Sequence, residues 1–347
     1  MQPFIPSKKF LVFGLIVLSV AVGSGANSID QLTNDPRNLS WNLNVDENKV
    51  VAAEACQKCH AAEINTWKQT PHFETFLTLH RKKEAQAIAS KLGIANFKND
   101  SHCIQCHYTM QKKETGIEAI AGVSCESCHG AAKDWVNVHQ DYGPGSTRLT
   151  EDPNHRFKRL TDSIHAGMRN PINVYLVAQS CYRCHTVPDE KLVNVGGHSA
   201  GSLDFELVSW SQGLVRHNFV RTDGKENIPS SPERLRQMFV AGMIADLEFS
   251  LRSTAVATEK ADFGITSAKR AARAADRLKS AQSKLQVPIL DEILAVYSGI
   301  TLRLKNHDPL VEAAEKVHQL GLKFAATVTG EQLVAIDAFI PPGNKWK

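Results

Sequence analysis

The sequence has little net charge, no long apolar run after its first 26 residues, and no cysteine outside one regular pattern. A membrane-spanning helix needs roughly 20 apolar residues, and no later segment offers them. The formal charge is only +4 over 347 residues. A charge this small gives no reason to expect nucleic-acid binding. The eight cysteines all fall into pairs, so none is left for an isolated thiol role.

The N-terminal segment has the organisation of a secretory signal peptide. Lys8 and Lys9 precede an apolar stretch over 10–22, and the small residues of 24–26 form a cleavage site. We therefore predict that residues 1–26 are removed and that the protein is periplasmic or otherwise exported. The alternative is an uncleaved signal, which would give weak or anchored membrane association. Residues 27–50 are expected to form an N-terminal arm.

Each cysteine pair is followed directly by a histidine. Cys-x-x-Cys-His is the attachment sequence of c-type haem. Two thiols about one helical turn apart reach the two vinyl groups of one porphyrin edge, and the adjacent imidazole lies under the ring and binds iron. The motifs predict four covalently bound haem c groups, with thioethers at Cys56, Cys59, Cys103, Cys106, Cys125, Cys128, Cys181 and Cys184 and proximal ligands at His60, His107, His129 and His185.

Other uses of paired cysteines fit less well. An even number of cysteines in an exported protein suggests disulfides, and two pairs of cysteines can build a zinc site. Cys-x-x-Cys also occurs in thioredoxin-like redox sites. None of these three chemistries requires a histidine after every second cysteine. Haem attachment also changes the charge, since removing the signal leaves +2 and each ferric haem adds about −1, for a total of about −2.

The sequence contains 14 histidines, so ten remain after the proximal ligands are assigned. A second histidine on the other face of a haem gives a six-coordinate iron suited to electron transfer, whereas an open face can bind a small molecule. His155 and His165 are candidates for a sixth ligand of the second haem. Met238 and Met243 could act as axial thioethers, but their helical spacing favours a place in the core.

We predict a mainly α fold of two parts. The tetrahaem cytochrome c domain is expected over 51–230, with short helices and loops around stacked haems. In this part the pattern predicts helices over 61–69 and 72–92, separated by Pro71. A cysteine-free bundle of four or five helices is expected over 231–347.

The bundle prediction is based on caps and apolar periodicity. Ser231 and Pro232 form an N-cap and first turn. An alanine-rich helix is expected over about 266–285, and another is expected to begin at Asp308. The first bundle helix carries an apolar stripe that we interpret as plain core, made of Leu235, Phe239, Met243, Leu247 and Leu251.

Residues around the first and third motifs resemble the tetrahaem cytochrome c-554 family, which supplies the electron acceptor of hydroxylamine oxidoreductase. The similar segments are Trp67-Lys68-Gln69-Thr70-Pro71-His72, Gly122-Val123-Ser124 before the third motif, and His139 ten residues after it. The resemblance covers roughly residues 50–230. Residues 231–347 have no counterpart in it and form an extra C-terminal helical region.

The resemblance implies closely packed haems and an incomplete ligand set. Three haems would have two histidines each, and the second haem would have His107 alone. His139 would be the distal ligand opposite His60, and His72 would be the distal ligand opposite His129. The distal ligand of the fourth haem, opposite His185, would be His217, with His198 as its rival.

Two main functions follow. The favoured one is a periplasmic electron carrier that passes electrons between redox partner proteins of unknown identity. The alternative is a multihaem oxidoreductase that acts on a nitrogen oxide or a similar small ligand at an open second haem. A third possibility is a subunit that docks into a larger complex through the bundle over 231–347.

The motifs make a prediction about the intact chain. Mass spectrometry and iron analysis of the exported protein should find about four haems and about four irons per chain, and loss of residues 1–26. The double variant Cys103→Ser/Cys106→Ser should lack about one haem, because both thioether positions of that haem are gone. An unmodified polypeptide, or zinc in place of iron, would contradict the haem assignment.

Overall fold

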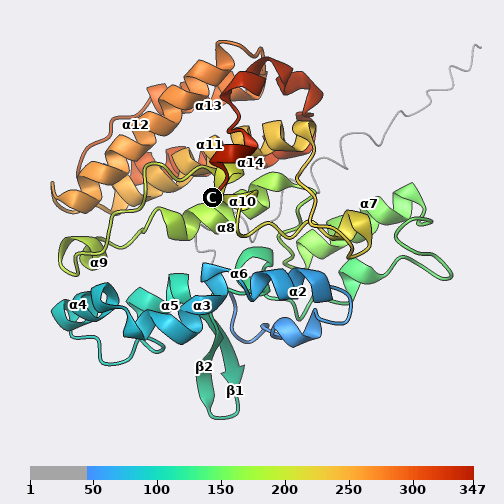
Figure 1. The fold of residues 1–347 in the computed structure, drawn as a ribbon. Coiled ribbons are helices and arrows are strands. Elements are labelled where there is room, and N and C mark those ends of the chain that lie inside the picture. Colours follow the sequence, from blue (N-terminus) through green and yellow to red (C-terminus); the bar gives the residue numbers. More distant parts are fainter. Residues whose placement is uncertain (1–44) are drawn as a thin grey trace, which may run out of the picture.

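The computed structural model describes residues 45–347, and the predicted signal peptide and most of the predicted arm lie outside this range. The described chain is mainly α, as expected, with a single two-stranded sheet among these residues. Figure 1 shows the N-terminal helices in one layer and the C-terminal helices in another, with α8 between them. Within 45–347 no helix is long and apolar enough to cross a membrane.

The N-terminal layer consists of short helices. Thr70 caps α3 by accepting a hydrogen bond from the Phe73 amide, and Pro71 is its first residue. The helix expected over 72–92 is broken, because Lys82 is extended (ψ 129°). Gly93 ends the second half with a left-handed φ of 71°. The helices of this layer are α2 (Ala61–Trp67), α3 (Pro71–Thr78), α4 (Lys83–Leu92), α5 (Ser101–His107) and α6 (Cys125–His129).

A β-hairpin, which the sequence did not predict, lies between α5 and α6. Strand β1 (Thr109–Lys113) pairs antiparallel with β2 (Gly116–Ala121). Beside it, the buried Thr109 hydroxyl donates to the Gly122 carbonyl at 2.7 Å. The hairpin therefore joins the second attachment motif to the third through a short, fixed connection.

The middle of the chain carries the fourth motif. Asp152 caps α7 by accepting hydrogen bonds from the Asn154 and His155 amides. The helices here are α7 (Pro153–His165), α8 (Val174–His185), α9 (Glu190–Asn194) and α10 (Leu207–Ser211). Short 3-10 turns complete the described chain at Ala53–Ala55, Leu79–Arg81, Val138–Gln140, Val220–Thr222, Glu331–Phe339 and Gly343–Lys345.

The C-terminal region is a bundle of α11 (Pro232–Val256), α12 (Asp262–Gln282), α13 (Pro288–Ser298) and α14 (His307–Thr327). Ser231 caps α11 as predicted. The apolar stripe predicted one buried face for this helix, but every residue from 238 to 255 is buried. A helix buried on all sides is the centre of a core rather than one of its walls.

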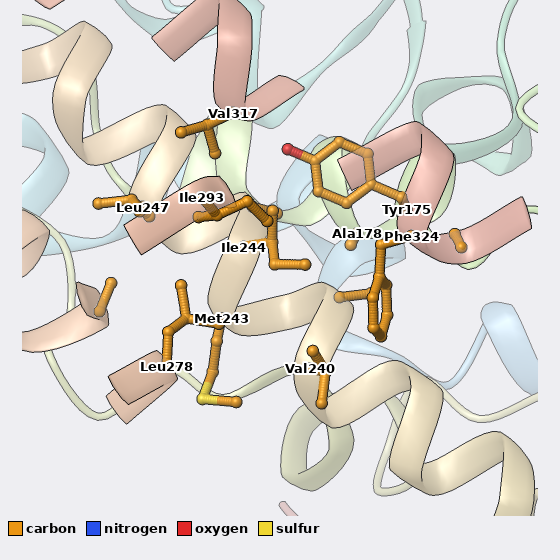
Figure 2. Packing of buried hydrophobic residues seen from close by; sticks show 14 of the residues in the cluster. Tyr175, Ala178, Val240, Met243, Ile244, Leu247, Leu278, Ile293, Val317 and Phe324 are labelled. Carbon is orange, nitrogen blue, oxygen red and sulfur yellow. The ribbon is translucent and has the colours of Figure 1, made fainter. Parts of the chain in front are cut away.

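The buried core crosses the predicted boundary at residue 230. One apolar cluster takes residues from α8 and α10 as well as from α11, α12, α13 and α14. Figure 2 shows Tyr175 and Ala178 of α8 near Ile244 of α11 and Phe324 of α14. The helix that ends in the fourth motif is thus packed as a member of the bundle.

A buried ionic network reinforces this packing. The Glu248 carboxylate accepts hydrogen bonds from the Tyr175 hydroxyl at 2.6 Å, from Gln179 Nε2 at 2.9 Å and from Arg252 Nε at 2.9 Å. His318 is fully buried and lies 3.5 Å from the same carboxylate. Because a buried carboxylate needs such partners, the network fixes α8 against α11 and α14.

Gly321 on α14 allows α8 to approach closely. A Cβ there would lie 2.3 Å from Tyr175 Cζ. We expect Gly321→Ala to lower the free energy of unfolding by ~1–3 kcal/mol, because the dense core cannot absorb the overlap. Gly299→Ala is the matched control, since its nearest neighbour would be 3.6 Å away, and it should change the value by less than ~0.5 kcal/mol. Denaturant unfolding followed by circular dichroism measures both, and equal stability of the two variants would contradict this account of the interface.

Candidate functional site

Local helical structure presents the cysteines and proximal histidines. Motif two forms most of α5, motif three forms α6, and motif four is the last turn of α8. Motif one is a turn that ends at His60, the N-cap of α2. Cysteines three residues apart on a helical turn lie on the same side of it, so each motif offers both thiols and the next imidazole to a common space.

The histidine rings face one another in four pairs. The centroid distances are 6.3 Å for His60–His139, 6.5 Å for His107–His198, 6.2 Å for His129–His217 and 6.3 Å for His72–His185. An imidazole nitrogen binds a metal at about 2.0–2.1 Å, so two opposed imidazoles on one metal have centroids about 6.3 Å apart. Each pair combines a motif histidine with one from a distant segment, at the separation that a shared iron requires.

Two pairings differ from those that the resemblance implied. His72 faces His185, and His217 faces His129, whereas the expectation was the reverse combination. The backbone of His72 nevertheless lies beside motif three. Val123, just before motif three, donates its N–H to the His72 carbonyl at 3.0 Å. The helix therefore lies beside motif three, while the ring itself turns to motif four.

The second motif histidine, expected to stand alone, has a partner. His198 faces His107 across 6.5 Å. His155 and His165, the other candidates for this position, both lie on α7. The His155 ring instead contacts Glu151, with 2.7 Å between Nδ1 and the carboxylate oxygen.

A cavity of about 170 Å³ opens beside this second pair. The His107 and His198 rings and Cys103 line it, with apolar side chains that include Ile88 and Leu192. Apolar walls beside a thiol and two imidazoles suit a porphyrin, which is largely apolar and is held by thioether and iron bonds. The residues present therefore fit the cofactor that the motif implies.

Burial lowers the pKa of five of the paired imidazoles and favours their neutral form. Desolvation lowers the pKa of His107 and of His129 to about 4 and that of His185 to about 3. The pKa values of His72 and His139 are also lowered by burial. A neutral imidazole has a free nitrogen lone pair, so burial prepares these side chains for metal binding at ordinary pH.

Backbone carbonyls orient several of the rings. The Nδ1 atom lies 2.7 Å from the Val215 carbonyl in His217 and 2.8 Å from the Ser199 carbonyl in His198. In His129 it lies 3.3 Å from the Arg169 carbonyl. A carbonyl can only accept, so these contacts place the ring proton on Nδ1 and leave Nε2 for a metal.

The thiols show which motifs are neighbours. The Cys56 and Cys125 thiols lie close enough to perturb each other's pKa, as do the Cys106 and Cys184 thiols. Motif one thus lies against motif three, and motif two against motif four. Within residues 45–347 no group of three or more cysteine, histidine or acidic side chains is arranged to hold a metal ion.

Residues outside the attachment motifs help to position the first ring pair. His139 faces His60, as the resemblance implied. The Arg159 guanidinium donates to the His139 carbonyl and makes two hydrogen bonds of 2.7 Å to Glu151. No motif marks Arg159 or Glu151. The sequence offered only an arginine on α7 and a glutamate just before this helix, two residues of opposite charge that could pair.

Met238 and Met243, considered as axial ligands, are both buried in the apolar core of the bundle. This agrees with the structural role that their spacing favoured.

Part of the chain is similar to known c-type cytochromes. Residues 55–130 match the model for cytochrome c554 and c-prime, a shorter region than the expected 50–230. The chain is 33% identical to cytochrome c-554 of Nitrosomonas europaea over 96 residues, which are 25% of this chain and 41% of that protein. It is 29% identical to the C-type polyheme cytochrome OmcB of Geobacter sulfurreducens over 34% of this chain and 18% of the relative. The chain thus spans less than half the length of either relative, and no solved structure matches it significantly.

The Glu151–Arg159 pair predicts a pH dependence of stability. Hydrogen bonding to Arg159 lowers the pKa of Glu151 from 4.5 to about 2. A lowered carboxyl pKa stabilises the fold above the unfolded value, and this contribution is lost as the pH falls through the folded value. We expect the free energy of unfolding to fall between pH 4.5 and about 2, and to fall less steeply in Glu151→Gln.

Denaturant titrations at several pH values measure this slope. The exposed Glu292 provides the matched control, and Glu292→Gln should keep the slope of the parent chain. If Glu151→Gln also kept it, the pair would not contribute as described.

Proposed function

We propose that this chain is a periplasmic tetrahaem electron-transfer cytochrome in which every iron has two histidine ligands. The match of residues 55–130 to the cytochrome c554 and c-prime model supports the cytochrome assignment. The similarity to cytochrome c-554 and to a polyheme cytochrome supports a multihaem electron-transfer cytochrome with covalently bound haem c and redox partners. The observation that carries the finer proposal is the set of four facing imidazole pairs.

Each haem takes one motif and one ring pair. A bound haem supplies an iron that gains or loses one electron, while the chain supplies thioethers, ligands and a buried environment. The first haem has Cys56, Cys59, His60 and His139; the second has Cys103, Cys106, His107 and His198; the third has Cys125, Cys128, His129 and His217; the fourth has Cys181, Cys184, His185 and His72.

Contacts between motifs support an order for electron passage. The Cys56–Cys125 contact makes the first and third haems neighbours, and the Cys106–Cys184 contact does the same for the second and fourth. Motifs three and four meet where the Ser180 hydroxyl donates to the Cys128 carbonyl at 2.8 Å. Electrons would therefore pass in the order first, third, fourth, second haem, or the reverse, and the redox partners would meet the first and second haems.

The alternative function needs an open iron. An oxidoreductase acting on a nitrogen oxide would bind its substrate at a haem whose second face is free. The candidate was the second haem, and the His198 ring occupies the position opposite His107. The contact favours electron transfer over catalysis at this haem.

The C-terminal bundle supports the haem-carrying part. Its helices share one core with α8, whose last turn is motif four. Residues 231–347 would therefore act as a scaffold for the fourth haem rather than as a separate docking module. Deleting them should disturb haem binding and not only partner binding.

Spin state tests the closed coordination of the second haem. We expect the oxidised protein to give only low-spin signals in electron paramagnetic resonance, and the reduced protein to bind no carbon monoxide. His198→Ala should create about one high-spin haem and bind about one carbon monoxide per chain, because one axial position becomes free.

The matched control for this experiment is His102→Ala. His102 lines the same cavity, but its ring is hydrogen-bonded to Asp189, with 2.5 Å between Nδ1 and the carboxylate oxygen. This variant should stay fully low-spin. A high-spin signal in the parent protein, or an unchanged spectrum in His198→Ala, would refute the assignment and revive the enzyme hypothesis.

A further inference from the structure

His217 is exposed, whereas the other three distal histidines are partly buried. It lies in the connection between α10 and the 3-10 turn Val220–Thr222. Leu214, in the same connection, is 65% exposed. Packing of this loop into the core therefore does little to hold the His217 ring at 6.2 Å from His129.

Residues from the far end of the chain contact this loop instead. The Lys347 N–H donates to the Ser209 carbonyl at 2.9 Å, and the Leu214 N–H donates to the Lys347 carbonyl at 2.8 Å. Figure 1 shows this end of the chain beside α10. The two hydrogen bonds lie on either side of Gly213 and fix the backbone where the loop leaves α10.

The approach at Gly213 is too close for any side chain. A Cβ on this residue would lie 1.6 Å from the Lys347 carbonyl oxygen and 2.3 Å from its carbonyl carbon. Glycine is the residue that permits such a backbone approach. The contact therefore depends on the residue type at position 213.

Side chains extend the contact to the residue before His217. The Arg216 guanidinium carbon lies 5.6 Å from the centre of the Trp346 ring, and the Lys347 ammonium lies 5.3 Å from the centre of the Trp210 ring. Trp346 is itself oriented, because its Nε1–H donates to the Pro341 carbonyl at 3.2 Å. Such cation–ring contacts attract electrostatically.

The other side of His217 is held within the loop. Asn227 donates to the Arg216 carbonyl at 2.6 Å and accepts from the Asn218 amide at 2.8 Å. This restraint fixes the local turn, whereas Trp346 and Lys347 attach the turn to the bundle.

We propose that Trp346 and Lys347 are positioning residues that hold the His217 loop so that its imidazole stays opposite His129. This inference builds on the proposed two-histidine coordination of the third haem. It gives the bundle a second task, since its final segment would secure a ligand of a haem that is carried by α6.

Carbon monoxide binding to the reduced protein tests the proposal. The expected result is no binding in the parent chain and about one carbon monoxide per chain in Gly213→Val and in Trp346→Ala, because each loosens His217. His217→Ala should also bind about one, and so should the double variant His217→Ala/Gly213→Val, because both changes open the same iron. Trp346→Phe, which keeps a ring beside Arg216, should restore the closed state.

Lys345→Ala is the control, because Lys345 lies in the same segment and its side chain has no part in the contact described. If Gly213→Val fails to fold, Trp346→Ala decides the question. Folded variants that bind no carbon monoxide would overturn the proposal, and so would a double variant that binds about two, since the third haem would then not be the one affected. Binding by the parent chain itself would refute the closed coordination, a failure separate from that of the contact.

Discussion

The structure depends on holding two imidazoles from distant segments on one axis, about 6.2 to 6.5 Å apart, at four places. A single covalent motif fixes the thiols and one ring, but the second ring comes from a segment of the chain that must be held independently. Carbonyl contacts at Nδ1 and a buried Arg159–Glu151 pair supply that restraint for several rings. The short helices of the N-terminal layer follow from this requirement, because each element has only to deliver one or two ligands.

The C-terminal bundle provides the rigidity that these short elements lack. Helix α11 is buried on all sides, and α8 packs on it with the fourth motif at its end. Burying Glu248 is tolerable because Tyr175, Gln179 and Arg252 satisfy its oxygens. Ordering the bound cofactors and their loops against this frame would cost less entropy than ordering them alone, because the frame is already fixed.

The local parts of this arrangement could be predicted from the sequence, and the long-range parts could not. The attachment motifs, the Ser231 cap and the mainly α class follow from neighbouring residues. The exchange of partners between His72 and His217 does not, since residue spacing says nothing about which way a ring turns. The β1–β2 hairpin lacked a clear alternating apolar pattern. The burial of His318 depends on Gln179 and Glu248, which reach it only in the folded chain.

Closed coordination at the second haem is the feature that separates the two functions. A carrier works best when its iron keeps the same ligands in both oxidation states, because little has to move when an electron arrives. A catalyst at the same iron needs a free position for its substrate. The proposed His107–His198 pair would meet the first condition, and the cavity beside these residues has apolar walls. Since the two rings come from α5 and from the loop after α9, the choice between carrier and catalyst rests on a contact between segments almost a hundred residues apart, outside the reach of any local motif.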